Sequence, residues 1–222
     1  MLDLPTPKDT VTVFVPIKNF HRAKSRMSPG LTGEMRIRLA RWFAFNTVTT
    51  FLNAVQTYAI CDDEETFEEL QSMGLLVIKS PLPGLNQSVN YALTWAQDNG
   101  VAYTFVAHSD LPLVSNEVVE ELLELRGSNF VVVPDRWGIG TNLLGIPSTV
   151  KMRAKFGKNS FADHTECDDH GYKAEVLRSK ALECDIDTIS DLHYVLERYP
   201  RLPFSKFCHR TLDVEIIRQV PV

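Results

Sequence analysis

Short apolar runs recur along this chain, separated by longer stretches in which polar and apolar residues mix. Runs of four to eight aliphatic and β-branched residues are typical of buried strands. We therefore predict strands at residues 11–16 (VTVFVP), 57–61 (TYAIC), 75–79 (LLVIK), 102–107 (AYTFVA), 129–134 (NFVVVP) and 142–147 (NLLGIP). A later run at 182–187 (LECDID) predicts one further strand.

The stretches between these runs predict helices. Residues 33–52 carry an apolar stripe that includes Leu39 and Phe43, and Thr32 precedes them as a plausible N-cap. The acidic run at 62–65 fits a helix start, where carboxylates face the positive end of the helix dipole. Further helices are expected near 87–98, near 115–125 behind Ser115, and near 189–198 behind Thr188 or Ser190.

Strands that alternate with helices predict an α/β fold with a mainly parallel sheet and helices on both faces. We expect residues 1–222 to form a single domain, with a core at about 11–198 and an irregular tail at about 200–222. Ligands of such sheets bind beyond the carboxyl ends of the strands, so polar residues that follow a strand are candidates for function.

Charge, cysteine spacing and hydropathy argue against a nucleic-acid binder, a zinc protein and a membrane protein. The formal charge of −5 over 222 residues argues weakly against nucleic-acid binding, which is usually accompanied by a basic balance. Cys61, Cys167, Cys184 and Cys208 form no C-x-x-C pair, so we expect reduced thiols and no zinc site. No apolar run approaches the length of a membrane span, and the acidic, proline-containing residues 1–10 do not resemble a signal peptide, so a cytoplasmic protein is expected.

A basic segment follows the first predicted strand. Lys18, Arg22, Lys24 and Arg26 place four cations within nine residues. A triphosphate needs such neutralisation, although a solvated basic loop explains the charges alone equally well. The segment is no P-loop, because the G-x-x-x-x-G-K-[ST] pattern is absent.

Carboxylates follow two other predicted strands. Asp110 ends the fourth strand, in the sequence His108-Ser109-Asp110, and Asp185 and Asp187 lie at the end of the late one. A carboxylate at a strand end can ligate magnesium, and a second could complete the same site. Asp110 as a turn residue and Asp187 as a helix cap are the structural alternatives.

Two glycine-containing segments offer hydrogen-bonding groups to a ligand. The first is residues 138–142 (GIGTN); its G-x-G pattern suits a simple turn equally well. The second runs from Phe156 through Gly157 and Ser160, which begins a predicted helix, with His164 one turn further on. Gly157 N–H, the Ser160 hydroxyl and the helix start together suit an anion, but Ser160 is also an ordinary N-cap candidate.

Six segments in order resemble one family: VPIKNFHRAKSR, PGLN, SDLPL, PDRWGIGTN, FGKNSFADH and DIDTISDL. They are similar to the guanylyltransferases of coenzyme F-420 biosynthesis, the CofC/FbiD family, from about residue 11 to 198. The resemblance implies a Rossmann-like nucleotidyltransferase domain, similar to the molybdenum-cofactor guanylyltransferase (MobA-like, the nucleotide-diphospho-sugar transferase fold). It also implies transfer of GMP from GTP to 2-phospho-L-lactate, phosphoenolpyruvate or 3-phospho-D-glycerate, with release of pyrophosphate.

The resemblance carries roles to individual positions. Asp110 matches the metal-binding, catalytic Asp of the family, and Asp187 matches the expected second ligand of a Mg²⁺ cofactor. The positions expected to surround GTP are Lys18, Lys24, Arg26 and Asn86, with Lys24 also catalytic through the departing pyrophosphate. Those that match acceptor-binding positions are Thr141, Gly157 and Ser160.

The chain also departs from the family. His108 and Ser109 stand where the family often has Pro-Ala, which alters the wall beside Asp110. The expected partners are GTP and a small phosphorylated acid, with no nucleic acid and no membrane, and a homodimer is the expected assembly. Transfer of another nucleotide to a sugar or alcohol phosphate, and a non-catalytic GTP-binding protein on the same scaffold, are the rival functions.

Overall fold

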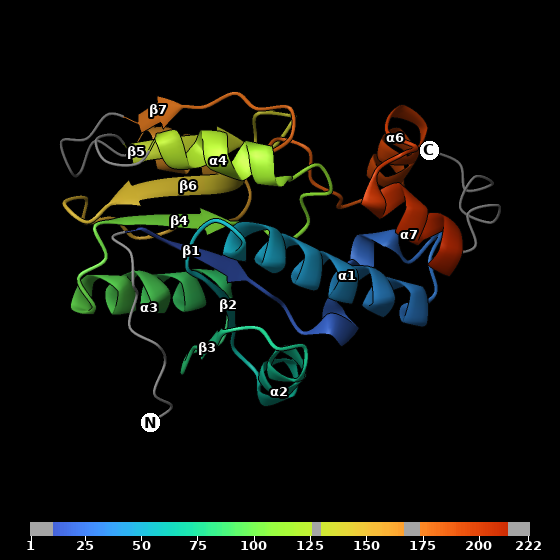
Figure 1. Ribbon diagram of the computed structural model, residues 1–222, viewed down its shortest axis with the longest axis horizontal. Helices are drawn as coiled ribbons and strands as arrows, with labels where there is room; N and C mark the ends of the chain where they lie inside the picture. The colour runs from blue at the N-terminus through green and yellow to red at the C-terminus, as the bar shows by residue number, and fades with distance from the viewer. Residues whose placement is uncertain (1–10, 126–129, 167–173, 213–222) are drawn as a thin grey trace.

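The computed structural model describes residues 11–125, 130–166 and 174–212, which form one twisted sheet flanked by helices (Figure 1). In the described residues the sheet has seven strands, in the order β3-β2-β1-β4-β6-β5-β7. Their bounds are β1 Val11–Pro16, β2 Thr57–Cys61, β3 Val77–Lys79, β4 Tyr103–Ala107, β5 Phe130–Pro134, β6 Thr141–Pro147 and β7 Ala174–Val176. The six apolar runs from 11–16 to 142–147 all contain a strand, which confirms that part of the prediction.

The sheet is mainly parallel, as predicted. Neighbouring strands run parallel from β3 through β2 and β1 to β4, and β5 runs parallel to β7. Only β6 among the described strands is antiparallel to its neighbours β4 and β5. It reverses because a short turn at residues 135–140 joins it directly to β5, whereas parallel neighbours need a longer crossover. The carboxyl ends of β1, β4 and β5 therefore face the same edge of the sheet as the start of β6.

Six of the described helices, α1 to α6, begin within about two residues of where the sequence predicts them, and α7 was not predicted. Their bounds are α1 Gly33–Leu52, α2 Glu64–Ser72, α3 Leu85–Asp98, α4 Asn116–Glu124, α5 Ser160–Thr165, α6 Ile189–Arg198 and α7 Pro203–Thr211. Thr32, Asp63, Ser115 and Thr188 each accept a hydrogen bond from a backbone N–H of the first turn of the helix that follows. Such caps satisfy donors that the helix itself leaves unpaired. Among the described residues, no helix is both long and apolar enough to cross a membrane.

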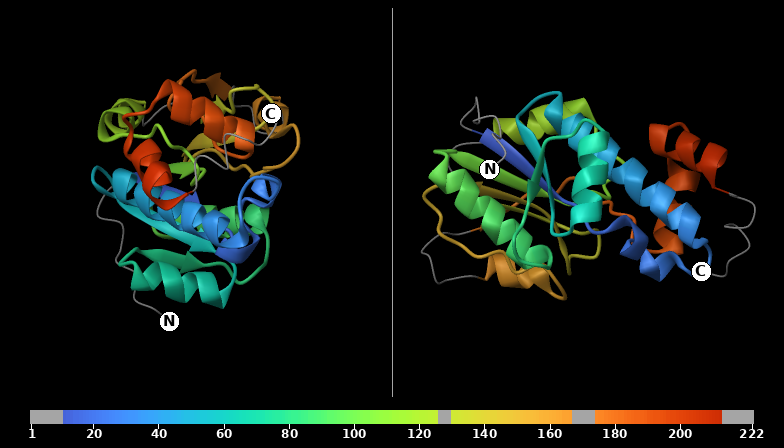
Figure 2. Two further views of the ribbon diagram at one scale, coloured as in Figure 1. Left: turned by 90° about the vertical axis from the view of Figure 1, so that its right-hand side faces the viewer. Right: turned by 90° about the horizontal axis from the view of Figure 1, so that it is seen from below.

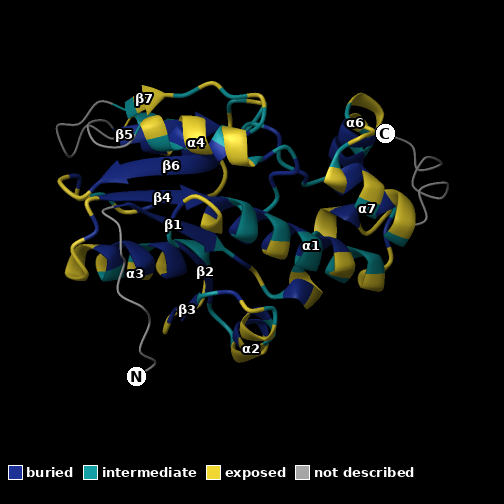
Figure 3. Ribbon diagram, viewed as in Figure 1, coloured by how far each residue is buried: buried dark blue, intermediate teal, exposed yellow. Residues whose placement is uncertain are grey.

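Alternating side chains of the strands face two helical layers, which the right-hand view of Figure 2 separates. Val13 and Val15 of β1 pack in one core cluster with residues of α1, α2 and α4. Phe14, between them, points to the other face and packs with residues of α3. Figure 3 shows the consequence, with the central strands β1, β2, β4, β5 and β6 largely buried, whereas the edge strand β7 is partly exposed and the helices carry their exposed residues on one side. Both faces of the sheet are thus covered, as predicted.

A third apolar cluster lies beyond the carboxyl ends of the strands. Two predictions about the residues near it, the strand at 182–187 and the irregular tail after Pro200, were wrong. Residues 182–187 form no strand. Leu182 lies in a turn and is buried in the same cluster as the inward side chains of β1, whereas Cys184 and Ile186 are buried in the third cluster, and β7 occupies the sheet edge beside β5. The tail after Pro200 is not irregular up to residue 212, since it contains α7, whose Phe204 is fully buried.

The thiols within the described residues are free. Cys61, Cys184 and Cys208 are buried and unpaired. Burial raises the pKa of these thiols to about 12, 11 and 12 respectively, so they are not activated nucleophiles. Cys167, residues 1–10 and the last ten residues of the predicted tail lie outside the described residues.

Candidate active site

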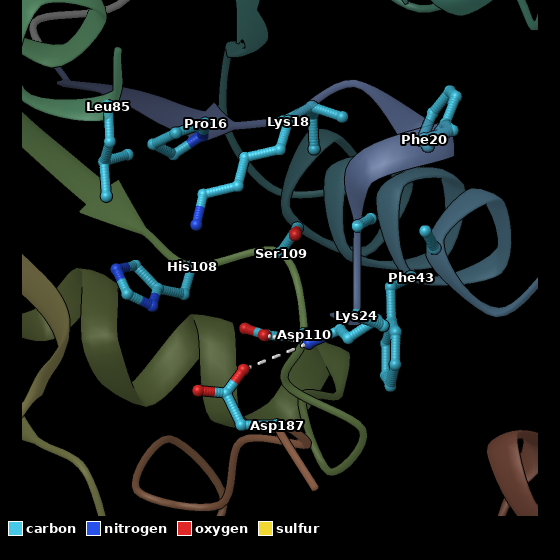
Figure 4. Close-up of a pocket in the computed structure, with 13 residues that line it drawn as sticks. Pro16, Lys18, Phe20, Lys24, Phe43, Leu85, His108, Ser109, Asp110 and Asp187 are labelled. Carbon is cyan, nitrogen blue, oxygen red and sulfur yellow. Dashed lines mark hydrogen bonds and ion pairs between the residues drawn. The ribbon is translucent and has the colours of Figure 1, made fainter. Parts of the chain in front are cut away.

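A pocket of about 170 Å³ opens at the carboxyl ends of β1 and β4 (Figure 4). Its polar side chains are Lys18, Lys24, His108, Ser109, Asp110 and Asp187. Apolar residues that include Pro16, Phe20, Phe43 and Leu85 form the rest of the wall. The parallel strands β1 and β4 pair directly, so the basic segment after β1 and the carboxylate after β4 reach the same space.

Lys24 contacts both carboxylates that line the pocket. Its ammonium donates to the Asp110 carboxylate and to the Ile186 carbonyl oxygen, and it lies 3.5 Å from Asp187 Oδ1. The side chain is only 9% exposed and packs over the Phe43 ring, with Nζ 5.4 Å from the ring centroid. The backbone of Lys24 is left-handed, with φ of 54°, a conformation that is uncommon for residues other than glycine. The turn between the two 3₁₀ segments Phe20–Arg22 and Ser25–Met27 thus directs this lysine inward.

Asp110 is ionised in this setting. Burial alone would raise the pKa of its carboxyl group, but the Lys24 charge and hydrogen bond outweigh burial and hold that pKa below its usual range. The loop that carries Asp110 is anchored, because Thr47 Oγ1 of α1 donates to the Ser109 carbonyl oxygen at 2.5 Å. The structural alternative for Asp110, a simple turn residue, does not account for this buried ion pair.

Asp187 and Asp185 come from the extended segment before α6. Asp187 directly precedes the N-cap Thr188, and its carboxylate also lies 3.2 Å from Arg26 Nη1. Burial, together with the nearby charges of Asp110 and Asp187, raises the pKa of the Asp185 carboxyl group to about 7. Asn142 Nδ2 donates a hydrogen bond to Asp185 Oδ1 at 3.4 Å. Three carboxyl groups therefore gather where one buried lysine supplies the opposing charge.

The donor set fits a magnesium ion that binds together with a substrate. Among the described residues there is no cluster of three or more His, Cys, Asp or Glu side chains placed to hold a metal by themselves. Magnesium rarely needs such a cage, since it is usually bound by one or two carboxylates, water and substrate phosphates. Asp110 and Asp187 meet that requirement, and a cation, the Lys24 ammonium, already lies against both.

The four predicted nucleotide-binding residues lie in different environments. Lys18 and Lys24 line the pocket, and Lys18 extends from the end of β1 toward His108 (Figure 4). Arg26 contacts Asp187 at the rim, with its side chain 73% exposed. Asn86 does not line the pocket; its amide donates to the Phe156 carbonyl oxygen at 2.9 Å and accepts from Phe156 N–H at 2.7 Å. Its observed contacts therefore hold the segment before Gly157.

The three predicted acceptor-binding residues lie beside the pocket, at the start of β6 and around α5. Thr141 and Ser160 are buried, and Gly157 is exposed with φ of 148°. Phe156 connects this region to the pocket, because its ring lies 5.2 Å from the His108 ring. The N-cap of α5 is Asn159, so Ser160 is the first helical residue rather than the cap.

His164 holds these acceptor-side elements together. Its Nε2 accepts from the Lys155 N–H at 3.0 Å, which leaves the proton on Nδ1, 2.9 Å from Thr141 Oγ1. Thr141 Oγ1 therefore accepts from the imidazole, and its own hydroxyl hydrogen remains available to a further acceptor. Burial lowers the pKa of His164 to about 4, so the ring is neutral near pH 7. Its spacing after Ser160 pointed to this residue, but no local signal indicated the contact with Thr141.

Comparison with known proteins places this arrangement in a class. A protein from Desulfovibrio desulfuricans G20, proposed to be a nucleotide-diphospho-sugar transferase, superposes with a TM-score of 0.76 at 16% identity, over 95% of this chain and 98% of that one. A nucleotidyl transferase from Methanothermobacter thermautotrophicus superposes with a TM-score of 0.56 at 16% identity, over 86% of this chain and 98% of that one. The fold is therefore that of the nucleotidyltransferases.

The sequence narrows the class to one family. The family model described as guanylyl transferase CofC-like matches residues 11–198, and the chain belongs to that family. The 2-phospho-L-lactate guanylyltransferase of Methanothermobacter thermautotrophicus is 29% identical over 188 residues, 82% of each chain. The phosphoenolpyruvate guanylyltransferase of Salinispora arenicola is 30% identical over 188 residues, 82% of this chain and 85% of that one. The family resemblance drawn from the six motifs is confirmed.

Proposed function

We propose that this protein transfers GMP from GTP to the phosphate of a three-carbon phosphorylated acid and releases pyrophosphate, as a step in coenzyme F-420 biosynthesis. The candidate acceptors are 2-phospho-L-lactate, phosphoenolpyruvate and 3-phospho-D-glycerate. The observation that carries the proposal is the pocket at the ends of β1 and β4, where Lys24 lies between Asp110 and Asp187. The names of the relatives support both the guanylyl donor and the first two acceptors.

The reaction needs positioning and charge neutralisation more than acid–base chemistry. An oxygen of the acceptor phosphate attacks the α-phosphorus of GTP in line, and the bond to the oxygen that bridges to the β-phosphate breaks. The acceptor phosphate is already anionic at neutral pH, so no side chain has to remove a proton. Lys18 and Lys24 are placed to offset charge on the phosphates, and Arg26 extends that positive edge toward the rim.

Magnesium is part of this proposal. Asp110 and Asp187 would hold it, and Asp185 lies close enough to both for their charges to raise its pKa. When bound, the ion would stabilise negative charge on the α-phosphate oxygens. Lys24 would then be released from the carboxylates and could turn toward a phosphate. Thr141, Gly157 and Ser160 stay the proposed acceptor-binding residues, because they lie across His108 and Phe156 from the carboxylates.

The test is Asp110→Asn, assayed by pyrophosphate release with GTP, magnesium and each of the three acids. We expect a loss of about 100-fold or more, comparable to removal of a central electrostatic group from an active site. Asp98→Asn, at the end of α3, is the matched control and should retain wild-type activity. Near wild-type turnover by Asp110→Asn would contradict the proposed role of the carboxylate.

The same assay separates the rival functions. Parallel reactions with CTP, ATP and UTP, read by mass spectrometry of the nucleotide product, distinguish a guanylyltransferase from a transferase of another nucleotide. Tight GTP binding without turnover on any of the three acids would instead favour a non-catalytic GTP-binding protein. The expected homodimer stays a prediction, because the structure contains a single chain.

A further inference from the structure

The Asp191 carboxylate connects the candidate metal ligand Asp187 to a distant loop. One of its oxygens, Oδ2, accepts from Asp187 N–H at 2.9 Å, from Thr188 N–H at 2.7 Å and from the Thr188 hydroxyl at 2.9 Å. The other, Oδ1, pairs with the Arg136 guanidinium. Asp191 is only 7% exposed, so its charge needs the arginine that it contacts.

Arg136 is itself held in a fixed position. Its guanidinium lies between two aromatic rings, 4.9 Å from the Trp137 centroid and 5.0 Å from the Tyr194 centroid. A planar guanidinium stacks on aromatic faces while it keeps its N–H groups available in the plane. The ring of Tyr194 belongs to α6, as does Asp191, so two contacts join Arg136 to this helix.

The turn that carries Arg136 is also rigid. The Asp135 carboxylate accepts from three backbone N–H groups of the same turn, at Trp137, Ile139 and Gly140, at distances of 2.8–3.0 Å. A Cβ at Gly140 would come within 2.8 Å of Asp135 Oδ2, so this close approach requires glycine. The turn leads directly into β6 and its first residue, Thr141.

The Asp187 side chain is held on one side only. It lies 3.2 Å from Arg26, which is 73% exposed, and 3.5 Å from Lys24, which is 9% exposed. An exposed pair such as that with Arg26 contributes little to the position of a side chain. Lys24 and the backbone N–H held by Asp191 therefore fix where the Asp187 carboxylate lies.

We infer that Arg136 is a positioning residue for the candidate metal site, acting through Asp191 on Asp187. A helix cap alone does not explain it, because Thr188 already caps α6 and Asp191 closes the capping box without an arginine. The arginine adds a link between the turn before Thr141 and the segment that carries Asp187. It thus couples the acceptor side of the pocket to the metal side. The inference rests on the proposed function, since it takes Asp187 as a metal ligand.

The experiment measures Mn²⁺ binding directly, from the electron paramagnetic resonance signal of free Mn²⁺ with the folded protein and GTP but no acceptor, after the Mn²⁺ bound by GTP alone is subtracted. We expect Arg136→Ala to weaken Mn²⁺ binding about tenfold, the usual effect of removing a group that orients a metal ligand. The magnesium concentration for half-maximal pyrophosphate release should rise by the same factor, with KM for GTP at saturating magnesium unchanged. Arg136→Lys keeps the charge without the planar fork and should recover only part of the loss.

Arg178→Ala is the matched control. Arg178 also pairs with a carboxylate, Glu183, at 3.7 Å, and lies 5.8 Å from the centre of the Phe161 ring, so its partners are neither Asp187 nor Asp191. Its Mn²⁺ affinity should equal that of the wild type. Wild-type Mn²⁺ affinity in folded Arg136→Ala would overturn the inference.

Two further variants keep the test decisive. Should Arg136→Ala fail to fold, Asp191→Asn retains a carbonyl oxygen for the cap but removes the charge that pairs with Arg136, and the same tenfold loss is expected. Wild-type affinity in Asp191→Asn would then overturn the inference.

Asp110→Asn tests the metal site itself and should abolish Mn²⁺ binding. If this variant binds Mn²⁺ as the wild type does, the proposed metal site is wrong, and this inference falls with it. If only Asp110→Asn loses binding, the proposed site stands and the role of Arg136 does not.

Discussion

At the scale of single residues, the four cations that follow β1 differ in how far their side chains are buried. Their spacing predicted a positive segment but could not tell which of them enter the site, where Lys18 and Lys24 line the pocket. Lys24 is nearly buried against Asp110, whereas Arg26 is mostly exposed and Arg22 lies outside the pocket. The left-handed backbone at Lys24 makes this distinction, because it turns one side chain toward the carboxylates.

Lys24→Met tests whether the ammonium competes with a metal for the carboxylates. At about 4 Å, a unit charge in a partly buried site is worth roughly 4 kcal/mol, so its removal should strengthen Mn²⁺ binding to the substrate-free protein by tenfold or more. Pyrophosphate release should fall at the same time, because Lys24 no longer offsets phosphate charge. Binding is measured by titration calorimetry with Mn²⁺. Lys206→Met, on the exposed face of α7, should leave both quantities unchanged, and equal Mn²⁺ affinity in Lys24→Met and wild type would rule out competition.

His164 should make folding stability depend on pH. Burial depresses the folded-state pKa of this residue to about 4, against 6.5 in the unfolded chain. The unfolded chain therefore binds a proton first as pH falls, so the stability is complete above about pH 6.5 and is lost progressively toward pH 4. The expected His164 contribution to the loss between pH 7.5 and pH 5 is about 2 kcal/mol, measured by urea unfolding as the difference between the wild type and His164→Gln, because Asp185, whose pKa is raised to about 7, acts in the opposite direction over the same range.

His164→Gln should remove most of that pH dependence, because glutamine does not titrate and can still offer an oxygen to the Lys155 N–H. The exposed His209, exchanged for Gln, is the control and should retain the wild-type slope. An unchanged slope in His164→Gln would mean that another group is responsible.

At the scale of elements, the helices after residue 188 lie beyond the sheet and support the pocket. Ile186, Leu192 and Phe204 pack in one cluster with Phe43 of α1, whose ring also contacts Lys24. The same packing thus buries α6 and α7 and supports the pocket wall. The tail, for which the sequence suggested no role, supplies part of that support.

Phe204→Ala tests this dependence. Phe204 is fully buried, 5.1 Å from the Phe43 ring and 5.2 Å from the Trp42 ring, so its loss should cost about 3–5 kcal/mol of unfolding free energy. Urea unfolding measures this change, and Lys206→Ala in the same helix should stay within about 0.5 kcal/mol of the wild type. A loss below 1 kcal/mol in Phe204→Ala would show that α7 contributes little to the fold.

At the scale of the whole molecule, strand order decides where the site forms. The chain adds β2 and β3 on one side of β1 and then crosses to place β4 on the other. Such a reversal leaves a crevice at the carboxyl ends of the two central strands, because the connections lead away to opposite sides. The pocket lies there, between Lys18 and Asp110. The net charge of −5 does not describe this place, where lysines and carboxylates meet at close range.

The sequence by itself determined the elements and the family. Short apolar runs, caps such as Thr32 and Ser115, and six ordered motifs depend only on neighbouring residues, so a single chain reveals them. The strand predicted at 182–187 was wrong for the same reason: alternating apolar residues indicate which side chains are buried, and only the tertiary structure shows that Cys184 and Ile186 pack with residues of α1, α6 and α7 rather than in a sheet. Tertiary structure alone decided that Lys24 joins Asp110, that Asn86 holds Phe156, and that Arg136 reaches Asp187 through Asp191. Each of these contacts joins residues 50 or more positions apart, and local pattern carries no information about such pairs.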